Sequence, residues 1–128
     1  MNIALEAKTN DYRLNDPIGN LQPFANSYEV AIDSLNQYDE IKIYTAGSEY
    51  RFTLTDPCSL TGSLAGGQLG EGTLEAQLVA VREGAKLNLK DELSIIGEGM
   101  RLIFYFLADD RNLVTSPIKR LALLKHKR

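Results

Sequence analysis

Basic side chains gather at the C-terminal end of the chain, where they could bind phosphate groups. Six lysines and arginines and no acidic residue follow residue 110 of the 128 residues. Each phosphate contact that such a cation makes adds to the salt dependence of nucleic-acid binding. The candidate nucleic-acid or anion ligands are Arg111, Lys119, Arg120 and Lys125.

The same cations could instead neutralise acidic groups of the protein itself. Residues 1–60 carry four basic and nine acidic side chains, and the net charge of the whole chain is −3. We favour this internal role, within one subunit or between two, because the basic end lacks a clear aromatic platform for bases. Nucleic acid stays the alternative partner, with Tyr44 and Tyr105 as the side chains on which bases would stack.

The residue types that usually carry catalysis are scarce. His126 is the only histidine and Cys58 the only cysteine of the sequence. A serine-hydrolase triad needs a histidine held by packing and an acidic orienter, and one histidine with one cysteine cannot form a transition-metal cluster. The acidic pairs at 39–40 and 109–110 are expected to be solvated. We therefore predict no catalytic residue, no metal and no cofactor. The alternative is an enzyme whose active site cannot be recognised in the sequence.

Two runs of alternating apolar and polar residues predict a β-hairpin. Residues 40–45 and 49–55 both alternate with a period of two, and Gly47 lies at the centre of their three-residue link. Such a link is typical of short hairpin loops. The glycine-rich stretch 59–73 lacks the Gly-Lys-Ser/Thr of a phosphate loop. We expect its glycines to allow a bend or a close approach between strands.

Residues 100–107 predict a strand that is apolar on both faces, which indicates a central or covered position in the fold. Ile103, Tyr105 and Leu107 share the second of these faces. They are the candidate oligomer contacts, and a homodimer is the expected assembly. The N-terminal arm is the other segment that could cover them.

Two segments fit either a helix or a strand. Residues 74–83 hold apolar side chains at both spacings, and residues 118–125 follow a Ser-Pro pair that could open a helix. We favour a strand in both, because their neighbours are predicted strands. The expected fold class is mostly β: a small barrel or sandwich of about five to seven antiparallel strands, with room for one short helix.

The length suits a single domain, residues 1–128. We expect residues 1–39 to form an irregular N-terminal arm, residues 40–124 the β core and residues 125–128 a basic tail. A lone cysteine argues against a disulfide scaffold. The first residues lack a leader pattern, and the longest apolar run, 102–108, is too short to span a membrane. A cytoplasmic protein without membrane association is expected.

Short motifs between residues 41 and 123 resemble those of short uncharacterised bacterial β-rich proteins. They are Gly-Ser-x-Tyr-x-Phe from Gly47, Gly-Gly-x-Leu from Gly66, a glycine-led apolar strand from Gly99 and Thr-Ser-Pro-hydrophobic from Thr115. The resemblance covers about two-thirds of the chain. It implies a small β fold and no particular activity. The function that the residues favour is that of a non-catalytic interaction or structural module.

Overall fold

Strands make up most of the computed structural model, which describes residues 21–27 and 29–126. The helical elements among them are the 3-10 turns η2 (Ile32–Ser34), η3 (Gly67–Leu69) and η4 (Lys90–Glu92). None of these turns is long or apolar enough to cross a membrane. The eleven strands are β1 (Leu21–Ser27), β2 (Glu29–Ala31), β3 (Glu40–Thr45), β4 (Glu49–Asp56), β5 (Thr61–Gly66), β6 (Thr73–Glu83), β7 (Lys86–Leu89), β8 (Ile95–Gly97), β9 (Arg101–Phe106), β10 (Arg111–Val114) and β11 (Ile118–His126).

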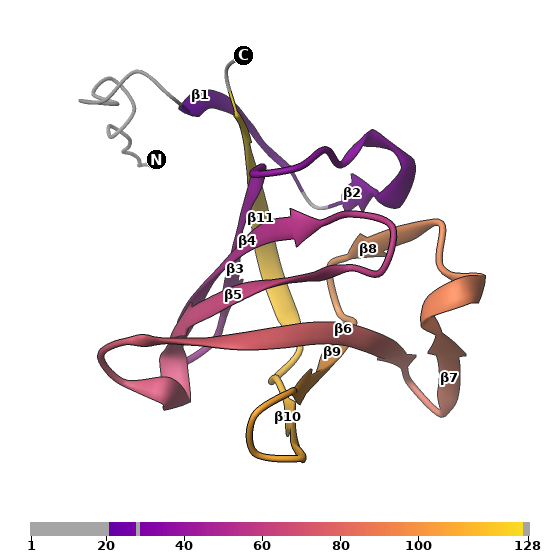
Figure 1. Ribbon diagram of the computed structural model, residues 1–128. Coiled ribbons are helices and arrows are strands. Elements are labelled where there is room, and N and C mark those ends of the chain that lie inside the picture. The colour runs from indigo at the N-terminus through magenta and orange to yellow at the C-terminus, as the bar shows by residue number, and fades with distance from the viewer. Residues whose placement is uncertain (1–20, 28, 127–128) are drawn as a thin grey trace.

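Nine strands form one curved antiparallel sheet, and β2 and β8 form a second, two-stranded sheet (Figure 1). The large sheet runs β1-β11-β3-β4-β5-β6-β9-β10, and β7 pairs with β6 off this path. The mostly antiparallel β class is therefore confirmed. The expected five to seven strands are too few. Four strands, β2, β7, β8 and β10, have only three or four residues, and the expected arm contains the strands β1 and β2.

The sheet is not a closed barrel, which corrects the barrel expectation. The start of β11 does reach the turn before β9: Ile118 N–H donates to Met100 O, and Gly99 N–H donates to Ile118 O, both at 2.8 Å. Beyond this point β9 pairs with β10 from Ile103 to Phe106. Because β10 occupies that edge of β9, β11 cannot pair along it and the sheet stays open.

The two segments whose sequences fitted either a helix or a strand are strands in the structure. Residues 74–83 belong to β6 and residues 118–125 to β11, so the predicted strands are confirmed and the helical alternatives are wrong. The hairpin of 40–45 and 49–55 is also confirmed, as β3 and β4. A β-bulge in β6 leaves Val79 as an extra residue between Leu78 and Ala80. This bulge shifts the inside-outside alternation of β6 by one residue.

The boundaries of the expected arm and tail differ from the structure. Residues 21–27 form β1, which pairs with β11, and residues 29–31 form β2, which pairs with β8. Lys125 and His126, expected in the tail, are the last residues of β11. Residues 1–20 and 127–128 of the expected arm and tail lie outside the described residues.

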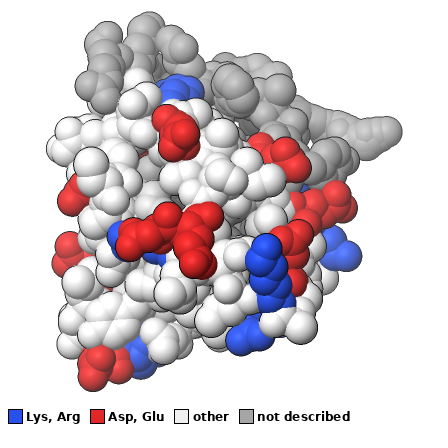
Figure 2. Space-filling model, turned by 90° about the vertical axis from the view of Figure 1, so that its right-hand side faces the viewer, with Lys and Arg blue, Asp and Glu red and all other residues white. Residues whose placement is uncertain are grey.

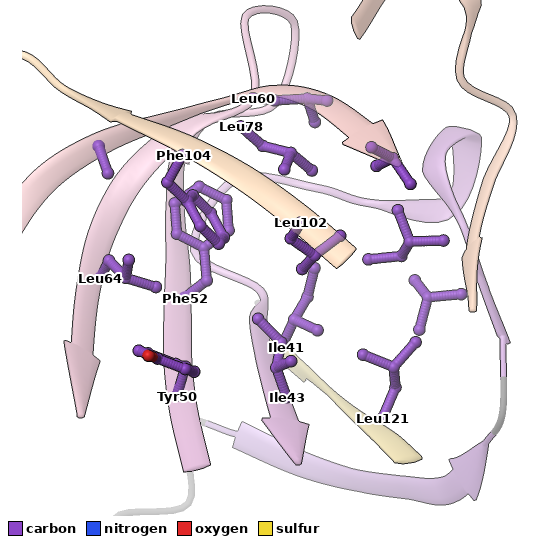
Figure 3. Packing of buried hydrophobic residues seen from close by; sticks show 14 of the residues in the cluster. Ile41, Ile43, Tyr50, Phe52, Leu60, Leu64, Leu78, Leu102, Phe104 and Leu121 are labelled. Atoms are coloured by element: carbon purple, nitrogen blue, oxygen red, sulfur yellow. The ribbon is translucent and has the colours of Figure 1, made fainter. Parts of the chain in front are cut away.

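The inner face of the large sheet holds the hydrophobic core. Phe52 and Phe104 meet edge to face at its centre, with ring centroids 5.0 Å apart (Figure 3). This geometry is the favoured one for paired aromatic rings. The apolar residues that alternate along the predicted hairpin and along one face of the predicted strand 100–107 are all buried in this core: Ile41, Ile43, Tyr50, Phe52, Leu54, Leu102, Phe104 and Phe106.

The glycine-rich stretch lets strands approach closely, as predicted. A Cβ atom added at Gly62 would lie only 2.0 Å from Thr53 O on the neighbouring strand β4. One added at Gly67 would lie 2.2 Å from the buried ring of Tyr50. The Tyr50 hydroxyl in turn accepts a hydrogen bond from Gln68 N–H at 3.3 Å. The glycines therefore serve backbone packing in β5 and the loop after it.

Candidate functional site

The four predicted phosphate ligands do not form one cluster. Arg111 lies on β10, the last strand of the large sheet, whereas Lys119, Arg120 and Lys125 lie on β11 near its other end. Arg111 Nε is 3.1 Å from Asp109 Oδ2, and its guanidinium lies 5.0 Å from the ring centroid of Phe106. The acidic turn before β10 thus already holds this cation.

Lys125 is held by a buried carboxylate. Its Nζ lies 2.6 Å from Asp39 Oδ2 and donates a second hydrogen bond to Ser34 O. Asp39 is fully buried and also accepts hydrogen bonds from the backbone N–H groups of Asn36 (2.9 Å) and His126 (2.8 Å). The expectation that Asp39 is solvated is wrong. At Lys125 the basic end does neutralise the acidic half of the same chain.

Arg120 belongs to a basic patch that the sequence did not reveal. Its guanidinium lies 4.2 Å from the ring centroid of Tyr44, its cross-strand neighbour on β3. Lys42, two residues before Tyr44, pairs directly with Arg51 of β4. Residues that alternate with the buried isoleucines of β3 point away from the core. We call Lys42, Arg51 and Arg120 the basic patch; Lys119 is exposed at the bulge just before it.

The three predicted oligomer contacts lie on the outer surface of β9, on the side of the sheet opposite the core. Ile103 and Tyr105 are half-buried, and Leu107 is 45% exposed just beyond the strand end. Together with the outward residues of β7, β6 and β10 they form what we call the outer face. Its further members include Glu75, Gln77, Ala80, Arg82, Leu89, Arg101, Asn112 and Val114.

An apolar row crosses the outer face from strand to strand. Leu89 of β7 pairs with Ala80 of β6, Ala80 pairs with Ile103 of β9, and Ile103 pairs with Val114 of β10. Directly paired residues of antiparallel strands place their side chains on the same face of the sheet, within contact distance. Leu89 is 55% and Val114 46% exposed. Ala80 is buried, with 5% of its surface exposed, and Ile103 is half-buried. The exposed apolar surface of the row therefore lies mainly on Leu89 and Val114, with Ile103 between them.

Polar rows flank the apolar row on either side. On one side Arg82 pairs with Arg101 and also with Leu87 of β7, which is 46% exposed, and on the other Gln77, Tyr105 and Asn112 are aligned across three strands. Beyond the second row lies Glu75, whose carbonyl accepts the N–H of Leu107 at 3.3 Å. The outer face is thus basic at one end of its strands and acidic at the other.

Tyr105 links the outer face to the turn between β9 and β10. Its hydroxyl donates a hydrogen bond to Asp110 Oδ1 at 2.8 Å. This hydrogen bond raises the pKa of the Tyr105 phenol, and slight desolvation and the negative charge of Asp110 act in the same direction. The acceptor fixes the phenol at the acidic end of the outer face.

Sequence reasoning missed the lateral extent of this face. Ile103 was identified from the doubly apolar strand, but Leu89 and Val114 lie in strands of four residues, which contain too few alternations to assign a face. Only the pairing register between the strands brings Leu89 and Val114 into line with Ile103. The bulge at Val79 also brings Ala80, and not its neighbours, opposite Ile103.

The side of the molecule that carries β8 adds no stronger candidate. On the side that carries β7 and β8, acidic and basic side chains are interspersed and neither sign covers a large area (Figure 2). No group of three metal-ligating side chains occurs in residues 21–27 and 29–126. No family model matches the chain, and searches of curated proteins and of solved structures find no match either.

Proposed function

We propose that the protein is a non-catalytic interaction module that self-associates through its outer face. The observation that carries this proposal is the apolar row, in which Leu89 and Val114 are about half exposed on either side of Ala80 and Ile103. Contiguous exposed apolar surface rimmed by polar residues is typical of protein interaction sites. Covering this row in a homodimer would remove it from water.

The surroundings of the rare catalytic residue types also favour binding over catalysis. The ring of His126 contacts the ring of Tyr38, with centroids 5.4 Å apart, and its backbone N–H donates to Asp39. Cys58 lies exposed in the turn after β4, where its N–H donates to Asp56 Oδ1. Both residues serve local structure at these positions.

The test of self-association is sedimentation velocity of the full chain over a wide concentration range. We expect a concentration-dependent dimer for the wild type and a monomer for Ile103→Asp, which places a charge in the apolar row. Thr53→Asp, on the outward side of β4, is a matched control that should leave the dimer intact. A wild type that stays monomeric at high micromolar concentration would contradict the proposal.

The basic patch supports a second candidate function, the binding of single-stranded nucleic acid. Lys42 and Arg51 are paired like charges, which destabilise a sheet when directly opposed. An anion would relieve this repulsion, and Tyr44 with Arg120 supplies an aromatic surface beside it. Glu49, opposite Tyr44, weakens the local positive potential. We therefore place this function second.

Fluorescence anisotropy with labelled single-stranded oligonucleotides at low salt tests the second function. Binding that weakens with added salt, and weakens further in Lys42→Gln/Arg51→Gln, would support it. Lys119→Gln, which removes a cation outside the patch, is the control. Equal affinity of the control and the double variant would assign the binding to general charge and not to the patch.

A further inference from the structure

The charges of the outer face are arranged so that the face complements itself. Arg82 and Arg101 are paired across β6 and β9 at one end, and Glu75 and Asp110 lie at the other. In residues 21–27 and 29–126, Arg82 and Glu75 form no ion pair. Directly opposed arginines repel each other, so this end gains from an anionic neighbour. The apolar row lies between the two charged ends.

We propose that two copies pack outer face to outer face with antiparallel strands, so that the basic end of one copy meets the acidic end of the other. This orientation rests on the self-association proposed above. It puts Arg82 of one copy against a second copy's Glu75, and Arg101 over the end of its β9, beside the turn that holds Asp110; a two-fold axis repeats the contact. In a parallel arrangement, Arg82 and Arg101 of one copy would face the same two arginines of the other copy. Interfaces avoid such like-charge contacts.

The geometry of packed sheets is compatible with this arrangement. Two aligned sheets pack about 10 Å apart with their strands within about 30° of each other. The axis would pass between the apolar row and the row of Tyr105. Ile103 of each copy would then lie over the second copy's Tyr105, whose ring offers apolar area while its hydroxyl keeps Asp110 as acceptor.

The size of the face sets the strength of the dimer. Four strands spaced about 4.8 Å apart and four rows spaced about 6.8 Å apart give a projected area of roughly 500 Å² for each copy, or about 1,000 Å² for the two copies together. This is near the low end of specific interfaces. We therefore expect a dimer that dissociates in the micromolar range. Since its charged contacts lie at the rim, added salt should weaken it.

Charge reversal on β6 tests the orientation in the full-length chain. Glu75→Arg and Arg82→Glu each place like charges together in the antiparallel dimer, and we expect each to raise the dissociation constant by about tenfold or more. The double exchange Glu75→Arg/Arg82→Glu restores opposite charges between identical copies. It should dimerise like the wild type, yet it should not form mixed dimers with the wild type.

Ile103→Asp in the same sedimentation series separates the two proposals. If Ile103→Asp dissociates the dimer and the charge reversals have no effect, the orientation is wrong and self-association stands. If Ile103→Asp has no effect, or if residues 1–20 keep the wild type monomeric by covering the face, both proposals fail. Mixed dimers between the double exchange and the wild type would also overturn the orientation. Circular dichroism spectra that match the wild type show that each variant is folded.

Discussion

Lys125 Nζ lies 2.6 Å from Asp39 Oδ2, although 86 residues separate the two along the chain. Asp39 is fully buried just before β3, and Lys125 is next to the end of β11. The carboxylate also accepts two backbone N–H groups, so its remaining lone pairs are satisfied. The contact joins the last strand to the loop that begins the β3–β4 hairpin.

Loss of the Asp39 carboxylate should destabilise the protein strongly. Asp39→Ala leaves Lys125 and two backbone N–H groups without their acceptor, and we expect a loss of about 3 kcal/mol in the free energy of unfolding. Urea denaturation measures this loss. Asp91→Ala is the control, because the Lys90–Asp91 pair is exposed and such pairs contribute little. Equal effects of the two variants would contradict the role assigned to Asp39.

The hydroxyl of Thr115 should contribute more to the stability of the protein than its methyl group. Leu102 N–H donates to Thr115 Oγ1 at 3.0 Å, and Thr115 is fully buried. Thr115→Val keeps the shape but orphans this buried N–H, which should cost about 1–3 kcal/mol. Thr115→Ser retains the acceptor and should keep the Leu102 amide protected from hydrogen exchange. An unchanged melting temperature for Thr115→Val would show that the hydrogen bond between Leu102 N–H and Thr115 Oγ1 is dispensable for stability.

A methyl group should be tolerated at one hairpin glycine and rejected at another. Gly62→Ala places Cβ against Thr53 O and must push β4 and β5 apart, so we expect a loss of about 2 kcal/mol or more. At Gly47 no atom lies within 4 Å of the added Cβ, and Gly47→Ala should change stability little. Melting temperatures of the two variants compare them directly.

The phenol of Tyr105 should titrate above the ordinary tyrosine pKa near 10 because of its hydrogen bond to Asp110. The folded state then keeps this proton at pH values where the unfolded state loses it. The stabilisation is present below the unfolded pKa and is lost as the pH rises through the folded pKa. Asp110→Asn should lower the Tyr105 pKa; asparagine suits the positive φ of 52° at this position.

The Tyr105 titration is followed from its ring resonances in NMR spectra at increasing pH. The wild type, titrated over the same pH range, serves as the reference. A Tyr105 midpoint that does not move in Asp110→Asn would mean that the negative charge of Asp110 does not contribute to the raised pKa.

Local alternation was enough to predict the β class and the inward residues of the main hairpins. Residues such as Phe52 and Phe104 recur every second position between turn signals, so one face of each strand is defined without knowledge of its neighbours. The openness of the sheet could not be predicted. It depends on β10 taking the edge of β9 that a barrel would need for β11.

The two most informative features of the structure depend on contacts between distant residues. Asp39 and Glu40 are adjacent acids in the sequence, and only the meeting with Lys125 distinguishes the buried one from the other. The apolar row needs the registers of four strands and the bulge at Val79, and none of these is encoded locally. Ile103 could be identified because its own strand is unusually apolar.

The position of β11 between β1 and β3 has a kinetic consequence. The strands from β3 to β6 follow one another through short links and can form early as local hairpins. β11 must find β3 across most of the chain, pairing for example Leu123 with Ile41, and closing so long a loop costs conformational entropy before these contacts form. We expect β11 to join after the rate-limiting step, so that Leu121→Ala accelerates unfolding far more than it slows refolding.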